Sequence, residues 1–152
     1  MSVDPRTPVL IGYGQINHRD DSAPVEPVDL MAAAARRAAT DRVLRAVDSI
    51  RVVNLLSARY RDPGALVGQR IGAQRPTTRY SPVGGNVPQS LVNQACLDIQ
   101  HGRAGVVLLT GGETWRTRTR LRRAGERLSW TQQDDTVPLA ECEGEDVPMV
   151  GP

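Results

Sequence analysis

The residues whose types and spacing could do chemistry lie in 81–113, where a turn of two glycines precedes a helical apolar pattern and a short apolar run. Gly84, Gly85 and Asn86 form this turn. Unpaired N–H groups and the helix dipole at such a helix start favour an oxyanion, a carboxylate or a phosphate. The alternative is that the glycines only let the chain turn tightly, because glycine adopts backbone angles that other residues avoid.

The elements around the turn can be predicted from local signals. Asn86 is a good N-cap, Pro88 suits a first helical turn, and Gly102 is typical of a helix end. The segment 106–109 is too short and too β-branched for another helix and indicates a buried strand. We expect the helix to be buried on more than one side, because its apolar positions form a wide stripe of Val87, Leu91, Val92, Ala95, Cys96 and Ile99.

This stretch resembles the thiolases and related acyl-CoA acyltransferases. The run 99–104, the strand after it and the run 110–113 are similar to I-x-x-G-x-A, an apolar strand and G-G-x-E, with Thr110 in place of the first glycine. The resemblance implies acetyl-CoA or another acyl-CoA as substrate, as in lipid metabolism, and a nucleophilic cysteine at the helix start. Counting back from Ile99 places that cysteine at Gly84 or Gly85, where this chain has no thiol. We therefore expect Gly84, Gly85 and Asn86 to bind substrate and no residue to be catalytic.

The two cysteines do not replace the missing one. Cys96 lies about 15 Å further along the helix at the usual rise per residue, and we expect it to be a small core residue. Cys142, Glu143 and Gly144 match the C-x-G of the second thiolase cysteine. An acidic run precedes this match and no glycine-rich turn follows, so we interpret it as accidental. Covalent thiolase chemistry requires a thiolate, so thiolase activity is not expected of this chain alone.

The order of elements predicts an α/β fold with a largely parallel sheet and helices on both faces. We expect strands over 8–13, 50–56 and 77–80, and helices from Pro27 and over 65–71. Leu30, Ala34 and Ala38 form the expected inner face of the first helix, and Met31 and Ala35 widen it. The resemblance implies one three-layer α-β-α thiolase-like half, incomplete here, with a half-domain over 1–115 and the start of a charged loop region over 116–152.

Two further patterns could indicate other functions, but both indications are weak. Gly12, Gly14 and Asn17 superficially resemble a dinucleotide fingerprint, but the third glycine is absent and no helix begins at once. His18 then falls in a polar loop, and we expect it to be solvated. The sequence contains neither a G-x-S-x-G motif nor a histidine-rich metal cluster, so nothing in it indicates a hydrolase. We predict no cofactor and no metal.

Arginines crowd residues 116–127 beside Trp115 and Trp130, and acidic residues crowd 134–146. Such a run can meet the phosphates of CoA or of a nucleic acid, but a solvated or self-paired face is its usual explanation. The formal charge is only +2, and lysine is absent. We therefore predict no nucleic-acid partner.

The remaining features of the sequence predict the compartment and the oligomeric state of the protein. Two unpatterned cysteines, no apolar leader after Met1 and no long apolar run predict a reduced, cytoplasmic protein without a membrane span. A thiolase subunit also has a second half that supplies a histidine and a cysteine, so we expect a truncated product. Its uncovered faces would favour a homo-oligomer or the missing half as partner. The two functional hypotheses are an acyltransferase-like protein and a non-catalytic acyl-CoA-binding or assembly module.

Overall fold

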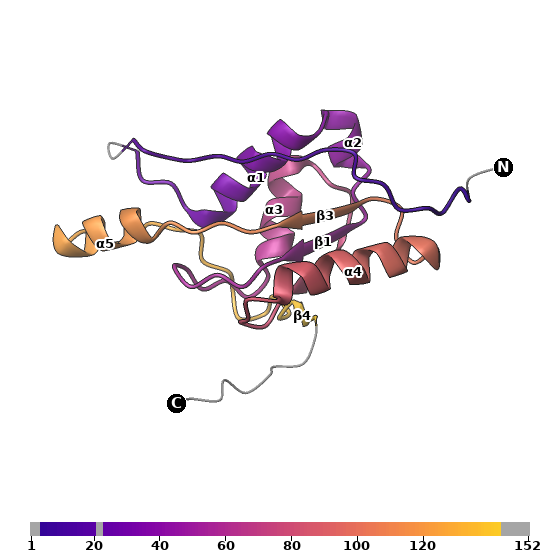
Figure 1. Cartoon of the computed structure of the whole chain (residues 1–152). Coiled ribbons are helices and arrows are strands. Elements are labelled where there is room, and N and C mark those ends of the chain that lie inside the picture. The colour runs from indigo at the N-terminus through magenta and orange to yellow at the C-terminus, as the bar shows by residue number, and fades with distance from the viewer. Residues whose placement is uncertain (1–3, 21–22, 144–152) are drawn as a thin grey trace.

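The computed structural model describes residues 4–20 and 23–143, and they form an α/β fold around a four-stranded parallel sheet (Figure 1). The strand order is β3-β1-β2-β4. The strands are β1 (Ser49–Val52), β2 (Thr77–Tyr80), β3 (Val107–Thr110) and β4 (Glu141–Cys142). The helices are α1 (Pro27–Ala38), α2 (Asp41–Arg45), α3 (Pro63–Ile71), α4 (Val87–Gln100) and α5 (Trp115–Arg123).

Local signals set most element ends as predicted. Pro27 is the first residue of α1, and Asp62 caps α3 by accepting a 2.8 Å hydrogen bond from the N–H of Ala65. Gly72 and Gly102 follow α3 and α4 with φ of +76° and +70°, the left-handed conformation that glycine adopts without a steric penalty. The prediction of β2 over 77–80 is confirmed, whereas β1 ends four residues before the expected Leu56.

The main apolar cluster lies on the face of the sheet that α1 and α3 cover, and a smaller group of buried apolar side chains, Val87, Leu91 and Ala95 of α4, lies on the other face. Ile50 and Val52 are fully buried in the main cluster against α1 and α3. Because strand side chains alternate between faces, Ser49 and Arg51 point to the other face, which α4 partly covers. The apolar cluster comprises Val28, Met31, Ala32, Ala35, Leu44, Val47, Ile50, Val52, Leu55, Leu66, Val67 and Ile71.

The predicted first strand over Pro8–Tyr13 is wrong. The segment is extended but joins no ladder, and it crosses the outer side of α1. A Cβ on Gly12 would lie 2.0 Å from the carbonyl oxygen of Ala38, and one on Gly14 would lie 2.3 Å from that of Ala34. The two glycines therefore let the backbone lie directly on the helix. The large apolar side chains of this segment remain 62–87% exposed: Val9, Leu10, Ile11 and Tyr13.

Two expected buried faces also differ. In α1 the predicted Met31 and Ala35 are buried, together with Pro27, Val28 and Ala32. The predicted Leu30, Ala34 and Ala38 are instead half-buried on the side that carries the N-terminal segment. In α4 only one narrow stripe is buried, and Val92 is exposed, because one sheet face is all that covers the helix. β3 is half-buried along its length, not fully buried as expected.

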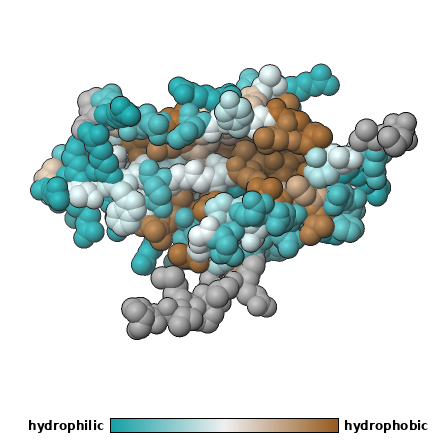
Figure 2. Space-filling view, in the orientation of Figure 1, coloured by the Kyte–Doolittle hydropathy of each residue, from teal (hydrophilic) through white to brown (hydrophobic). Residues whose placement is uncertain are grey.

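α5 extends from the body, and the chain after it returns to the sheet, where β4 pairs with β2 (Figure 1). Figure 2 shows an apolar patch over β3, between the N-terminal trace and α4, within an otherwise mostly polar face. Within 4–20 and 23–143, no helix combines the length and hydropathy needed to cross a bilayer.

Candidate functional site

The carboxyl ends of β1, β2 and β3 meet at one edge of the sheet, which is where open α/β sheets hold their ligands. The loop that follows β1 is fixed there by the end of β2. The N–H of Asn54 donates to Oγ of Ser81 at 2.9 Å, and that of Leu55 donates to the hydroxyl of Tyr80 at 2.8 Å. This edge is therefore a rigid rim and not a free loop.

Glu113, the acid of the Thr-Gly-Gly-Glu run, fastens the same loop from the other side. Its two carboxylate oxygens accept from the N–H groups of Leu56 at 2.6 Å and Ser57 at 2.8 Å. The N–H of Thr114 donates to Oγ of Ser57 at 3.0 Å. The most distinctive motif of the sequence thus contributes a structural clamp at the rim.

Gly84, Gly85 and Asn86 lie exposed at this rim, at the amino-terminal end of α4. Asn86 is the N-cap residue as predicted, but its side chain makes no capping hydrogen bond. The carbonyl of Gly84 accepts from the N–H of Val87 at 3.3 Å, and a Cβ on Gly85 would meet no atom within 4 Å. The turn offers a helix start with open space above it, which suits an oxyanion or a phosphate oxygen.

Neither cysteine reaches this position. Cys96 is half-buried on the flank of α4, so the prediction of a core residue is only partly correct. Cys142 is exposed on the short strand β4. His18, expected to be solvated, is half-buried and contacts the carbonyl of Ala23 through Nε2 at 2.9 Å. Among the described residues, no group of three or more histidine, cysteine or acidic side chains could hold a metal ion.

The arginine run forms α5, which begins beside the rim. Arg118 lies over the ring of Trp115, 5.0 Å from its centre, and donates through Nη1 to the carbonyl of Leu56 at 3.1 Å. The helix therefore contacts the loop that Glu113 holds. This position is compatible with the predicted contact to a ligand phosphate and equally with a solvated face.

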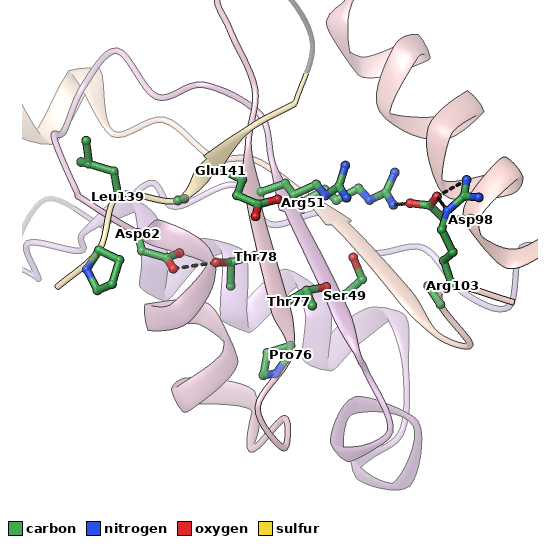
Figure 3. Close-up of a pocket in the computed structure, with 14 residues that line it drawn as sticks. Ser49, Arg51, Asp62, Pro76, Thr77, Thr78, Asp98, Arg103, Leu139 and Glu141 are labelled. Atoms are coloured by element: carbon green, nitrogen blue, oxygen red, sulfur yellow. Dashed lines mark hydrogen bonds and ion pairs between the residues drawn. The ribbon is translucent and has the colours of Figure 1, made fainter. Parts of the chain in front are cut away.

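A buried ion-pair cluster, which the sequence analysis did not find, lies on the α4 side of the sheet (Figure 3). Arg51 is 1% exposed and donates to Asp98 of α4 and, at 2.8 Å, to Oε1 of Glu143. Arg103 donates through Nε to Asp98 at 2.6 Å, and Arg79 lies 3.6 Å from Glu143. A guanidinium inside an otherwise apolar strand was the available signal, because a buried arginine requires acidic partners.

The pKa values of the two carboxyl groups of the cluster shift in opposite directions. Burial alone would raise the pKa of Asp98, but the hydrogen bonds and charges of Arg103 and Arg51 lower it below its ordinary value. Burial raises the pKa of Glu143 and outweighs the opposing charges of Arg51 and Arg79.

Comparison with solved structures relates the fold to known proteins. No protein-family model and no curated protein matches the sequence. The chain is similar to the crystal structure of a monomeric SCP2-thiolase-like protein type 1 from Mycobacterium smegmatis, with a TM-score of 0.63 and 33% sequence identity. The match covers 75% of this chain and 25% of that protein, so the chain spans about a quarter of the length of the structure that it matches. The chain therefore has a thiolase-like fold, as the resemblance predicted.

Proposed function

We propose that this chain is a thiolase-family, acyl-CoA acyltransferase-like protein that binds acyl-CoA at the rim but has no thiolase activity of its own. The 33% identity to an SCP2-thiolase-like protein supports the family. The observation that carries the proposal is the start of α4, which presents Gly84, Gly85 and Asn86 at the carboxyl edge of the sheet and no thiol.

The chemistry of the turn determines what it can do. The exposed N–H groups and the dipole of the 14-residue helix α4 stabilise negative charge on a bound thioester carbonyl or phosphate. A covalent acyl-enzyme needs a thiolate within reach of that carbonyl, and no cysteine stands at the turn. The turn is thus equipped for binding and polarisation but not for nucleophilic attack.

The test uses a variant that fills the space above the turn. We expect acetyl-CoA to raise the melting temperature of the wild-type chain, because a ligand that binds the folded state stabilises it. Gly85→Leu should abolish this shift without unfolding the chain, since nothing lies within 4 Å of the new Cβ. Ala46→Leu, which adds the same side chain at an exposed position remote in sequence, is the matched control.

Two outcomes would reject the proposal. The absence of any shift at millimolar acetyl-CoA would remove the binding role, as would a shift that Gly85→Leu leaves intact. Mass spectrometry after incubation with acetyl-CoA checks the second part. A stable acetyl thioester on Cys96 or Cys142 would show that a thiol does participate.

The second candidate is a module for subunit assembly, which the exposed apolar run of residues 9–13 favours. Its occupant would be a second copy of the chain or a missing half. Sedimentation velocity distinguishes the candidates, because an assembly module should associate with increasing concentration. A monomer at all concentrations would exclude self-assembly.

A further inference from the structure

A second candidate site, separate from the glycine turn, is a cavity of about 580 Å³ on the α4 side of the sheet. Its floor is formed by side chains that β1 and β2 direct to the same face: Ser49, Arg51, Thr77 and Arg79. One wall is the end of α4 with Asp98 and Arg103, and the other is the chain from Pro138 to Glu141 (Figure 3). The cavity is large enough for a small metabolite.

Most carboxylate oxygens in the cavity are already engaged by the protein. Asp98 accepts from Arg51 and Arg103, one oxygen each. Asp62, on the opposite side, accepts from the N–H of Ala65 at 2.8 Å and from the hydroxyl of Thr78 at 2.6 Å. The exceptions are Glu141, which is exposed at the rim of the cavity, and Oε2 of Glu143 in the adjoining ion-pair cluster, which is buried and has no hydrogen-bond partner within the described residues. The cavity therefore has little acceptor capacity left for a cationic ligand.

Donor groups, in contrast, remain available. Nε of Arg51 is buried and has no hydrogen-bond partner within the described residues. Ser49 is 3% exposed, and no hydrogen bond within 4–20 and 23–143 engages its hydroxyl. Arg79 and Arg103 are more accessible, and in the part of the chain described here each pairs with a single carboxyl group. Three guanidinium groups share the two carboxyl groups of Asp98 and Glu143.

We infer that this cavity binds a small phosphate ester, with the phosphate on the floor between Arg79, Arg103 and Ser49. Arginine forks and a hydroxyl match the tetrahedral acceptor oxygens of phosphate. The other end of the ligand lies toward Glu141 and carries hydroxyl groups, because the free acceptor at that end is a carboxylate. The site lies on the face of the sheet, over residues 49–51 of β1 and 77–79 of β2, and none of its lining residues belongs to the glycine turn, so the inference does not depend on the proposed function.

The experiment titrates the wild-type chain with inorganic phosphate and with glycerol 3-phosphate by isothermal calorimetry, at an ionic strength held constant with chloride. We expect saturable binding of both, with glycerol 3-phosphate the tighter ligand. Arg103→Gln and Arg79→Gln should each weaken binding by about tenfold, the size expected for one charge-assisted hydrogen bond. Arg122→Gln removes the same charge from exposed α5 and should leave binding unchanged.

A variant that does not change charge completes the test. Thr77→Phe places an aromatic ring in the cavity from an exposed position and should abolish binding, while the melting temperature confirms that the chain is folded. If Arg79→Gln fails to fold, the phosphate affinities of Arg103→Gln and Thr77→Phe decide whether the inference holds. The inference is overturned if phosphate does not bind saturably in the millimolar range, if the folded cavity variants bind as wild type, or if Arg122→Gln weakens binding equally. Gly85→Leu should bind glycerol 3-phosphate normally, which separates this site from the acyl-CoA proposal.

Discussion

The guanidinium of Arg51, in the middle of β1, is paired with the carboxylate of Asp98, two residues before the end of α4, the helix that lies on this face of the sheet. The pair joins β1 to α4, which partly covers that face of the sheet. A buried guanidinium is costly without acidic partners, so the position of α4 is coupled to this charge. Glu143 supplies the second partner at 2.8 Å.

We predict that Asp98→Asn lowers the free energy of unfolding by about 3 kcal/mol, because it leaves Arg51 and Arg103 with one fewer counter-charge. Because Glu143 remains as a partner of Arg51, we expect the loss of unfolding free energy to lie at the lower end of the range for a broken buried ion pair. Urea denaturation measures this change in the free energy of unfolding. The control is Glu141→Gln, which alters an exposed carboxyl of the same cavity. A loss equal to that of the control would show that the pair has no structural role.

The acid sensitivity of the fold should depend on Glu26, which is 6% exposed. Burial alone would raise its pKa, but hydrogen bonds from Thr131 and Tyr60 and the charge of Arg70 lower the pKa below the ordinary 4.5. A lowered pKa stabilises the fold above the unfolded-state pKa, and this contribution is lost as the pH falls through the folded-state value. Stability should therefore decline below about pH 4.5.

Glu26→Gln should lower stability at pH 7 and converge with wild type as the pH falls through the lowered folded-state pKa, because below that pKa the wild-type carboxyl is protonated in both states. Denaturation curves at several pH values between 3 and 7, on the order of one unit apart, test this. Glu126→Gln controls for the loss of one exposed charge. A constant difference between Glu26→Gln and wild type at all pH values would contradict the assignment.

The clamp by Glu113 predicts a local effect. Glu113→Gln replaces one acceptor oxygen with a donor, so one of the two N–H groups of Leu56 and Ser57 loses its partner. We expect hydrogen exchange at these amides to accelerate by about tenfold, corresponding to one charge-assisted bond. Core amides of β1 should be unaffected. Unchanged exchange at both amides would mean that the loop is held by Ser81 and Tyr80 alone.

Backbone conformation predicts opposite effects at two glycines. Gly72 has φ of +76°, and a Cβ there would make only an ordinary contact at 3.8 Å with Arg45. Gly72→Ala should therefore lower the free energy of unfolding by about 1 kcal/mol through backbone strain alone. Gly85→Ala, with open space and no positive φ, should be neutral or slightly stabilising. Thermal melts of the two variants provide the comparison, and equal destabilisation would contradict this reasoning.

Sequence reasoning succeeded where the signal was local. Pro27, Asn86, Gly72 and Gly102 mark element ends because proline, a polar cap and glycine act through their own backbone angles. The strand over 77–80 and the parallel α/β fold were also predicted correctly from sequence patterns. The binding role of Gly84, Gly85 and Asn86 remains a prediction, although the structure places all three at the carboxyl edge.

The tertiary structure alone decided what depends on contacts between distant residues. An apolar run such as Pro8–Tyr13 has the composition of a strand, but pairing also requires that the run reach a sheet edge, and here the glycines let it lie on α1 instead. Which stripe of α1 is buried depends on the packing of this helix into the apolar cluster on the sheet. The pairing of Arg51 with Asp98, and the cavity beside them, depend on the register of β1 against β2 and on the placement of α4, which no local preference specifies.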